Sequence, residues 1–234
     1  MKLTTLLIAL LILISSNSSA QTKSDTINQT DENGLKQGYW KKHNENGMLK
    51  YEGRFVNDKP TGDFTYYYPD GIVKAISFFY DDGKKAITTT FHYSGQKMTE
   101  GFYIDKKKDS LWKYYNNSGL LLKEEFYRNN KKNGTWKTFF EDGQVAEETS
   151  WKQNNKDGPW KQYFPTGKLK LEGFYLDDEQ QGEIKYYYPS GRINITGQYD
   201  KSLRVGEWFY MDEDSKVVKK EIYENGKLVE EKDY

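Results

Sequence analysis

Aromatic, charged and turn-forming residues recur along this chain with a fixed spacing of 24 residues. The copy that starts at Gly158 reads GPWKQYFPTGKLKLEGFYLDDEQQ, and it aligns without a gap to the rest of residues 38–229. A fixed period over eight copies is typical of an array in which each unit contacts only its neighbours. Copies one to eight begin at Gly38, Gly62, Ala86, Ser110, Gly134, Gly158, Gly182 and Gly206.

Each copy is predicted to be a β-hairpin. Triplets such as Glu45-Asn46-Gly47 and Pro189-Ser190-Gly191 combine a turn former, a polar residue and a glycine that can adopt positive φ. The runs on either side are rich in Tyr, Phe, Trp, Thr and Val, which favour strands. Turn signals about every dozen residues leave no room for helical runs. The pattern therefore predicts an all-β fold: an elongated, single-layer, twisted antiparallel sheet of eight 24-residue β-hairpin repeats.

The turn also predicts which side chains share a face. A three-residue turn with a left-handed glycine pairs Tyr163 with Leu169 across the hairpin. Simple alternation then places Tyr163, Leu169 and Tyr175 on one face of the sheet. Trp160 and Phe174 are expected on the opposite face, together with lysines and glutamates.

Five of the six tryptophans occupy the third position of a copy or its equivalent, and an aromatic residue occupies the eighteenth position of every copy. Copy three departs from the pattern, with Ala86 in place of glycine and Thr88 in place of tryptophan, and copy seven has Ile184 in place of tryptophan. The departure in copy three is interpreted either as an interruption of the aromatic ladder or as sequence drift in one copy.

The combination of an initial glycine, a tryptophan, a paired aromatic residue, a turn glycine, a glutamate and a closing aromatic residue resembles the MORN repeat variant family. The resemblance covers residues 38–229 and implies a single-layer, elongated antiparallel sheet used for binding. Bacterial members are often labelled as the antitoxin of a toxin–antitoxin pair, and no catalytic residue comes with the family. The residues that carry it are Gly134, Trp136, Phe139, Gly143, Glu148 and Trp151 in copy five, and Gly158, Trp160, Tyr163, Gly167, Glu172 and Tyr175 in copy six.

The chain ends are predicted to serve export and capping. Residues 1–20 contain Lys2, an apolar run over 6–14 and small residues up to Ala20, which together predict a secretory signal peptide cleaved after Ala20. The apolar run is short for a membrane span, so we expect no integral membrane segment after its removal. Residues 21–37 are expected to be a polar leader, and residues 230–234 the tail of a charged capping strand. The expected location is the bacterial periplasm or the outside of the cell.

Composition argues against several kinds of chemistry. The 35 basic and 35 acidic residues balance, so nucleic acid is not an expected partner. The chain has no cysteine, and its histidines, His43 and His92, show no metal-ligand or triad spacing. We therefore predict no enzyme activity, no catalytic residue, no cofactor and no metal site.

The remaining hypotheses concern binding. The first is a secreted, non-enzymatic repeat scaffold that binds a protein or an extended peptide along its aromatic face or edge. The second is a carbohydrate or cell-wall binding module, and the third is an antitoxin or immunity protein. The tryptophans are expected either to pack between hairpins or to contact the ligand. The candidate contact residues are Trp112, Trp136, Trp160 and Trp208.

Overall fold

The structure, a computed structural model, describes residues 26–234, which form one antiparallel sheet of 20 strands. The predicted signal peptide and its cleavage point after Ala20 lie outside the described residues. The strands are β1 Gln29–Thr30, β2 Lys36–His43, β3 Leu49–Val56, β4 Lys59–Tyr67, β5 Val73–Tyr80, β6 Lys85–Phe91, β7 Lys97–Ile104, β8 Lys107–Tyr115, β9 Leu121–Arg128, β10 Lys131–Lys132, β11 Gly134–Phe139, β12 Val145–Lys152, β13 Asn155–Tyr163, β14 Leu169–Leu176, β15 Glu179–Gln180, β16 Gly182–Tyr187, β17 Ile193–Asp200, β18 Leu203–Met211, β19 Val217–Glu224 and β20 Lys227–Asp233.

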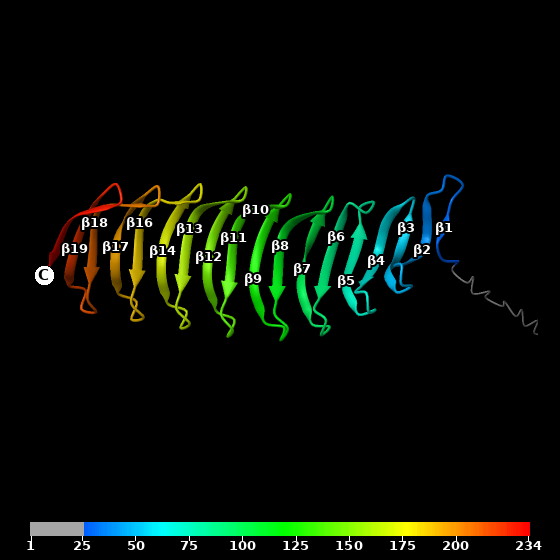
Figure 1. Cartoon of the computed structure of the whole chain (residues 1–234), viewed down its shortest axis with the longest axis horizontal. Helices are drawn as coiled ribbons and strands as arrows, with labels where there is room; N and C mark the ends of the chain where they lie inside the picture. The colour runs from blue at the N-terminus through cyan, green and yellow to red at the C-terminus, as the bar shows by residue number, and fades with distance from the viewer. Residues whose placement is uncertain (1–25) are drawn as a thin grey trace, which may run out of the picture.

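Consecutive strands pair along the whole ribbon, so the sheet is a meander that stays open (Figure 1). The tight turns within the hairpins line one long edge, and the loops between hairpins line the other (Figure 1). Strands β10 and β11 both pair with β9, and β15 and β16 both pair with β14, so each couple acts as one interrupted strand. The predicted all-β, single-layer sheet of hairpin repeats is confirmed. Within residues 26–234, nothing helical is long and apolar enough to cross a membrane.

The turn chemistry is confirmed in detail. Gly167 has φ +79°, in the left-handed region that glycine enters without steric cost, and the pairing of Tyr163 with Leu169 is observed. Ser215 holds the same turn position in copy eight with φ +63°. The 24-residue spacing therefore reproduces one three-residue turn in each copy.

The predicted distribution of side chains between the two faces is wrong for Tyr175 and Phe174. It is also wrong for the lysines and glutamates expected beside Trp160, because charged pairs such as Lys137 and Glu148 lie on the face of Tyr163. The register shifts between Gln162 and Tyr163, because three residues from Leu169 to Leu171 lie opposite these two. This β-bulge reverses the alternation beyond it. Tyr175 consequently packs on Trp160, with ring centroids 5.2 Å apart, and does not share the face of Tyr163.

The first face, here called the ladder face, carries the third-position rings and the closing aromatic residues at the eighteenth position. The second, here called the ion-pair face, carries alternating lysines and glutamates. These side chains form ion pairs across neighbouring strands: Lys41 Nζ lies 3.3 Å from Glu52, and Lys137 Nζ lies 3.0 Å from Glu148.

Neighbouring copies are linked on the ion-pair face by tyrosine hydroxyls. The fifteen-residue separation in each link joins a glutamate of one copy to the tyrosine before the turn of the next copy. Because these bonds cross between hairpins, they set how consecutive copies lie side by side. The donor and acceptor pairs are Tyr67 to Glu52, Tyr115 to Glu100, Tyr163 to Glu148 and Tyr187 to Glu172.

Candidate functional site

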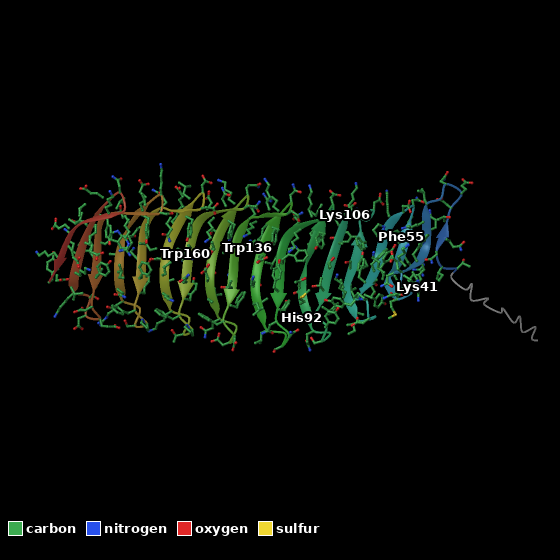
Figure 2. All side chains as sticks on the ribbon, viewed as in Figure 1. Lys41, Phe55, His92, Lys106, Trp136 and Trp160 are labelled. Atoms are coloured by element: carbon green, nitrogen blue, oxygen red, sulfur yellow. The ribbon has the colours of Figure 1, made fainter. Side chains whose placement is uncertain are left out.

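The predicted tryptophan contacts occupy two different environments. Trp112 and Trp208 are 2% and 0% exposed. Of the two expectations for these rings, the structure shows packing between hairpins and leaves almost no surface for contact with a ligand. Trp136 and Trp160 are half-buried on the same face, in the half of the strands nearer the inter-hairpin loops, whereas His92 lies at the tight-turn edge (Figure 2). Their binding role stays a prediction.

The buried rings lie over glycines of the preceding strand. A Cβ atom added to Gly101 would approach Cδ2 of Trp112 to 2.2 Å, and one added to Gly197 would approach Cδ2 of Trp208 to the same distance. Neither glycine has positive φ, so the close approach of a ring, and not backbone conformation, demands glycine there. A single-layer sheet has no interior core, so these rings supply much of the apolar surface that it buries.

Three third-position rings, Phe64, Trp136 and Trp208, also lie between two closing aromatic rings. Trp136 is 5.3 Å from Tyr127 and 5.2 Å from Trp151, measured between ring centroids. Phe64 is 5.1 Å from both Phe55 and Phe79. These tilted and edge-on arrangements are favourable for aromatic pairs.

A cation covers most steps of the ladder, and the sequence analysis did not identify it. The cation lies two residues before the start of a copy, where it is the cross-strand neighbour of a closing aromatic residue, as Lys156 is of Trp151. Lys132 Nζ lies 4.0 Å from the ring centre of Trp151 and 4.6 Å from that of Trp136. Such contacts stabilise by cation–π attraction and close the ladder to solvent. The sequence feature that could have revealed this cation is a basic residue that recurs two positions before a copy. The residues are Lys36, Lys108, Lys132, Lys156 and Arg204.

A carboxylate replaces the ladder glycine in two copies. Glu125 is 8% exposed and accepts a hydrogen bond of 2.9 Å from the hydroxyl of Tyr127. Lys108, whose pKa is lowered by burial, donates to the hydroxyl of Tyr114 at 2.8 Å. Burial and the nearby carboxylate raise the pKa of Tyr127 to about 12. The group is fully hydrogen-bonded, so we interpret it as a structural network.

The equivalent network in copy eight is centred on Glu221. Although burial alone would raise its pKa, hydrogen bonds from Lys219, Tyr210 and Tyr223 hold the pKa of Glu221 below its ordinary value. Arg204 completes the group at 3.6 Å. These contacts stabilise the charged carboxylate close to the C-terminal end of the sheet.

The ladder is interrupted at copy three, as one of the two interpretations of Ala86 and Thr88 proposed. Thr88 carries no ring, and its hydroxyl shares a hydrogen bond of 2.8 Å with that of Ser77 in the glycine position. The side chains of Ser77 and Thr88 are buried. No aromatic ring therefore lies between Phe79 and Tyr103.

The cation is also displaced at this point. Most copies start with positive φ and a bulge, as at Gly62, where φ is +64° and the register shifts between Gly53 and Arg54. Strands β5 and β6 pair without a register shift, so Ala86 becomes the cross-strand neighbour of Phe79 and Lys84 stays in the loop. In copy one, Pro60 takes the same place beside Phe55.

These substitutions leave a pocket of about 460 Å³ on the ladder face, here called the ladder pocket. Its walls include Phe55, Phe64, Phe79, Ala86 and Tyr103. Its loop-side rim includes Asp58, Lys84 and Lys106, and Figure 2 shows Lys106 at the edge formed by the inter-hairpin loops. The pocket has the size and the mainly aromatic lining of small-molecule sites.

The ion-pair face of the same copies carries a second exposed feature, here called the apolar row. It crosses five consecutive strands through the pairs Phe78–Ile87, Ile87–Phe102 and Leu111–Phe126. Phe78, Ile87 and Leu111 are 48%, 55% and 40% exposed. Beyond Phe126, the equivalent positions of copy five are polar.

Among residues 26–234, no cluster of three or more His, Asp or Glu side chains is arranged to hold a metal ion. The sheet presents two candidate binding surfaces. One is the ladder pocket, with cations at its rim, and the other is the apolar row on the ion-pair face.

Solved structures resemble the chain only distantly. TarM from S. aureus has a TM-score of 0.31 at 15% identity, over 40% of this chain and 20% of its own. The Tc holotoxin pore of Photorhabdus luminescens has a TM-score of 0.21 at 11% identity, over 79% of this chain and 11% of its own. A porin-like protein from Bacteroides uniformis has a TM-score of 0.21 at 8% identity, over 83% and 92%. This chain spans about a fifth of the length of TarM.

No curated protein matches the chain. The model of the MORN repeat variant matches residues 36–57, 60–82, 132–153, 156–177, 180–201 and 217–234, which is more than half of the chain. The unmatched stretch 83–131 includes copy three, where Ala86 and Thr88 replace the usual residues. The hairpin fold, the turn glycines and the matched segments agree, and the chain belongs to the MORN repeat variant family.

Proposed function

We propose that this protein is a secreted, non-enzymatic scaffold that binds a partner protein through the apolar row. The observation that supports the proposal is the exposure of Phe78, Ile87 and Leu111 in one row that crosses consecutive strands on the ion-pair face. Contiguous exposed apolar side chains rimmed by polar residues are typical of protein interaction sites.

Supporting contacts prepare the row for binding. Tyr80 lies 6.2 Å from Phe102 and 6.3 Å from Phe78, between ring centroids, so the aromatic side chains hold each other in place. The strands beneath them are paired on both sides, which keeps the backbone rigid. Little conformational entropy is then lost when a partner docks.

The residue at the second position also explains why copies seven and eight are weaker candidates. The second position of a copy is Ile87 in copy three and Leu111 in copy four, but Glu183 in copy seven and Glu207 in copy eight. Charged residues at the centre of an interface must be desolvated, which opposes binding. The proposal therefore locates the interface on copies two to four.

Site-specific photo-crosslinking in cells tests this proposal. A photo-reactive amino acid at position 87 or 111 is expected to capture the same discrete protein, whereas position 183 or 207 captures none. The captured protein, once purified, should bind Ile87→Ser and Leu111→Ser variants about ten-fold more weakly or worse, because truncating buried apolar anchors costs over 1 kcal/mol. Equal crosslinking at all four positions, or none at 87 and 111, would contradict the proposal.

Export is a separate part of the proposal and has its own measurement. Cell fractionation followed by N-terminal sequencing is expected to find the protein outside the cytoplasm with Gln21 as its first residue. A cytoplasmic protein that starts at Met1 would rule out secretion and leave the interface proposal to the crosslinking test.

A further inference from the structure

We infer that the ladder pocket binds a planar aromatic molecule that carries an acidic group. This site lies on the ladder face, opposite the apolar row, and does not depend on the proposed protein partner.

The shape of the pocket favours a flat ring. Elsewhere in the ladder a third-position ring bridges two closing aromatic rings, as Trp208 does at 5.2 Å from Tyr199 and 6.2 Å from Tyr223. Phe79 and Tyr103 are the corresponding walls in copy three, and Thr88 supplies no ring between them. The pocket itself lies on the loop side of this gap. Its walls include Phe55, Phe64, Phe79 and Tyr103, so a flat ligand ring would gain offset or edge-on contacts with these side chains.

Access to the pocket follows from the two missing cations. Lys36 and Lys108, on either side, lie 4.8 Å from the ring centre of Phe55 and 4.4 Å from that of Trp112. Between them, Pro60 and Ala86 are the cross-strand neighbours of Phe55 and Phe79 and cannot reach over the rings as a lysine does. The ladder is therefore open from the loop side where copies two and three meet.

The loops above the pocket are also arranged differently. In other copies a loop residue bonds to the preceding loop: Asn130, for example, donates its backbone N–H to the carbonyl of Lys108 at 2.8 Å, and its side chain accepts from the Lys108 N–H at 2.6 Å. At copy three, Asp82 accepts from the ammonium group of Lys59 at 2.7 Å instead. The longer loop before β6 leaves the pocket mouth between Lys84 and Lys106.

The rim charges favour an anion. Lys84 and Lys106 line the pocket, and both are exposed at the loop edge. The acidic rim residue, Asp58, already accepts a hydrogen bond of 2.9 Å from the backbone N–H of Lys36. The rim thus carries two ammonium groups against one carboxylate. This net positive charge would attract a carboxylate attached to the ring, and salt weakens the attraction.

Calorimetric titration of the whole chain with indole-3-acetate tests the inference. The expected result is saturable binding, weaker with the neutral isostere indole-3-acetamide and absent with cyclohexylacetate, which lacks a flat ring. Binding should weaken as the salt concentration rises. No saturable binding of indole-3-acetate, or equal binding of cyclohexylacetate, would overturn the inference.

Two variants locate the site. Ala86→Phe adds a ring at a residue that lines the pocket, and it is expected to weaken indole-3-acetate binding about ten-fold or more by filling the pocket. Ile184→Phe adds a ring to the ladder in copy seven, away from the pocket, and should leave binding unchanged. Unaltered binding by Ala86→Phe, with circular dichroism showing a folded sheet, would overturn the site.

The exposed double variant K84E/K106E keeps the test decisive if Ala86→Phe does not fold. It is expected to weaken indole-3-acetate binding and to leave indole-3-acetamide binding almost unchanged. An equal loss for both ligands, or no loss for either, would contradict the role of the two lysines. The crosslinking sites at 87 and 111 lie on the other face, so failure of this inference and failure of the proposed protein interface can be told apart.

Discussion

Ser77 and Thr88 lie opposite each other in β5 and β6 and share a buried hydrogen bond of 2.8 Å between their side-chain oxygens. The same two positions hold Gly101 and Trp112 one copy later, where the ring fills the space above the glycine. The serine–threonine pair and the glycine–tryptophan pair are alternatives. A tryptophan ring needs glycine beneath it, whereas a threonine leaves room for a serine hydroxyl.

This relationship predicts non-additive mutations. Thr88→Trp alone should destabilise the protein by about 1–3 kcal/mol, because the indole meets the Ser77 side chain in a packed layer. Adding Ser77→Gly should recover most of that loss. Urea denaturation of the two single variants and the double variant measures the coupling. Strictly additive effects would show that the two side chains do not compete for the same space.

Gly206 and Ser110 predict opposite effects of backbone conformation. Gly206 has φ +63°, and an added Cβ atom would meet no other atom within 4 Å, so Gly206→Ala should cost about 1 kcal/mol through strain alone. Ser110 adopts φ +59° at the same repeat position and already bears this strain. Ser110→Gly is therefore expected to be neutral or stabilising. Thermal unfolding compares them, and a stabilising Gly206→Ala would contradict the argument.

Glu52 predicts part of the acid sensitivity of the fold. Hydrogen bonds from Tyr67 and Tyr39, together with Lys41, lower its pKa below the ordinary value of 4.5. The unfolded chain then binds more protons at acid pH. The contribution of Glu52 to the free energy of unfolding is therefore fully present above pH 4.5 and falls as the pH drops below that value. Glu52→Gln should be less stable than the wild type at pH 7, with a gap that closes at low pH. Urea midpoints at both pH values measure this, and Glu45→Gln in an exposed turn is the control.

Tyr67 predicts sensitivity at the other end of the pH scale. Burial, the hydrogen bond to Glu52 and the charge of that carboxylate raise the pKa of Tyr67 to about 12. The ordinary pKa of a tyrosine is 10. The stabilisation that protonated Tyr67 contributes is therefore fully present below pH 10 and is lost as the pH rises towards 12. Tyr67→Phe should cost about 1 kcal/mol at pH 7 and should reduce the fall in stability above pH 10. Tyr93→Phe, at an exposed ring, should leave the alkaline fall unaltered; an unchanged fall in Tyr67→Phe would contradict the assignment.

Features that depend on neighbouring residues were predictable from the sequence, and features that depend on contacts between strands were not. Gly167 has positive φ and Tyr163 faces Leu169, as their places in the repeat predict, because turn geometry depends on neighbouring residues. The bulge that moves Tyr175 onto the face of Trp160 was not visible, since a strand with a bulge and one without it can have the same length and composition.

The candidate site was predictable in part. The absence of a ring at Thr88 was evident in the sequence, and the ladder pocket lies close to it, with walls from copies one to three. Trp112 and Trp208 were expected either to pack between hairpins or to contact a ligand, and they are buried over Gly101 and Gly197, because a ring can fold over a glycine of the adjacent strand. That contact joins neighbouring strands, and no local pattern reveals it.

The sequence by itself determined the repeat length, the turns and the hairpin class of the fold, because each depends on residues a few positions apart. Only the tertiary structure decided which rings are covered, where the cations lie and where the ladder opens between Phe79 and Tyr103. Those features depend on the bulges between hairpins, which determine the side chains that meet across copies.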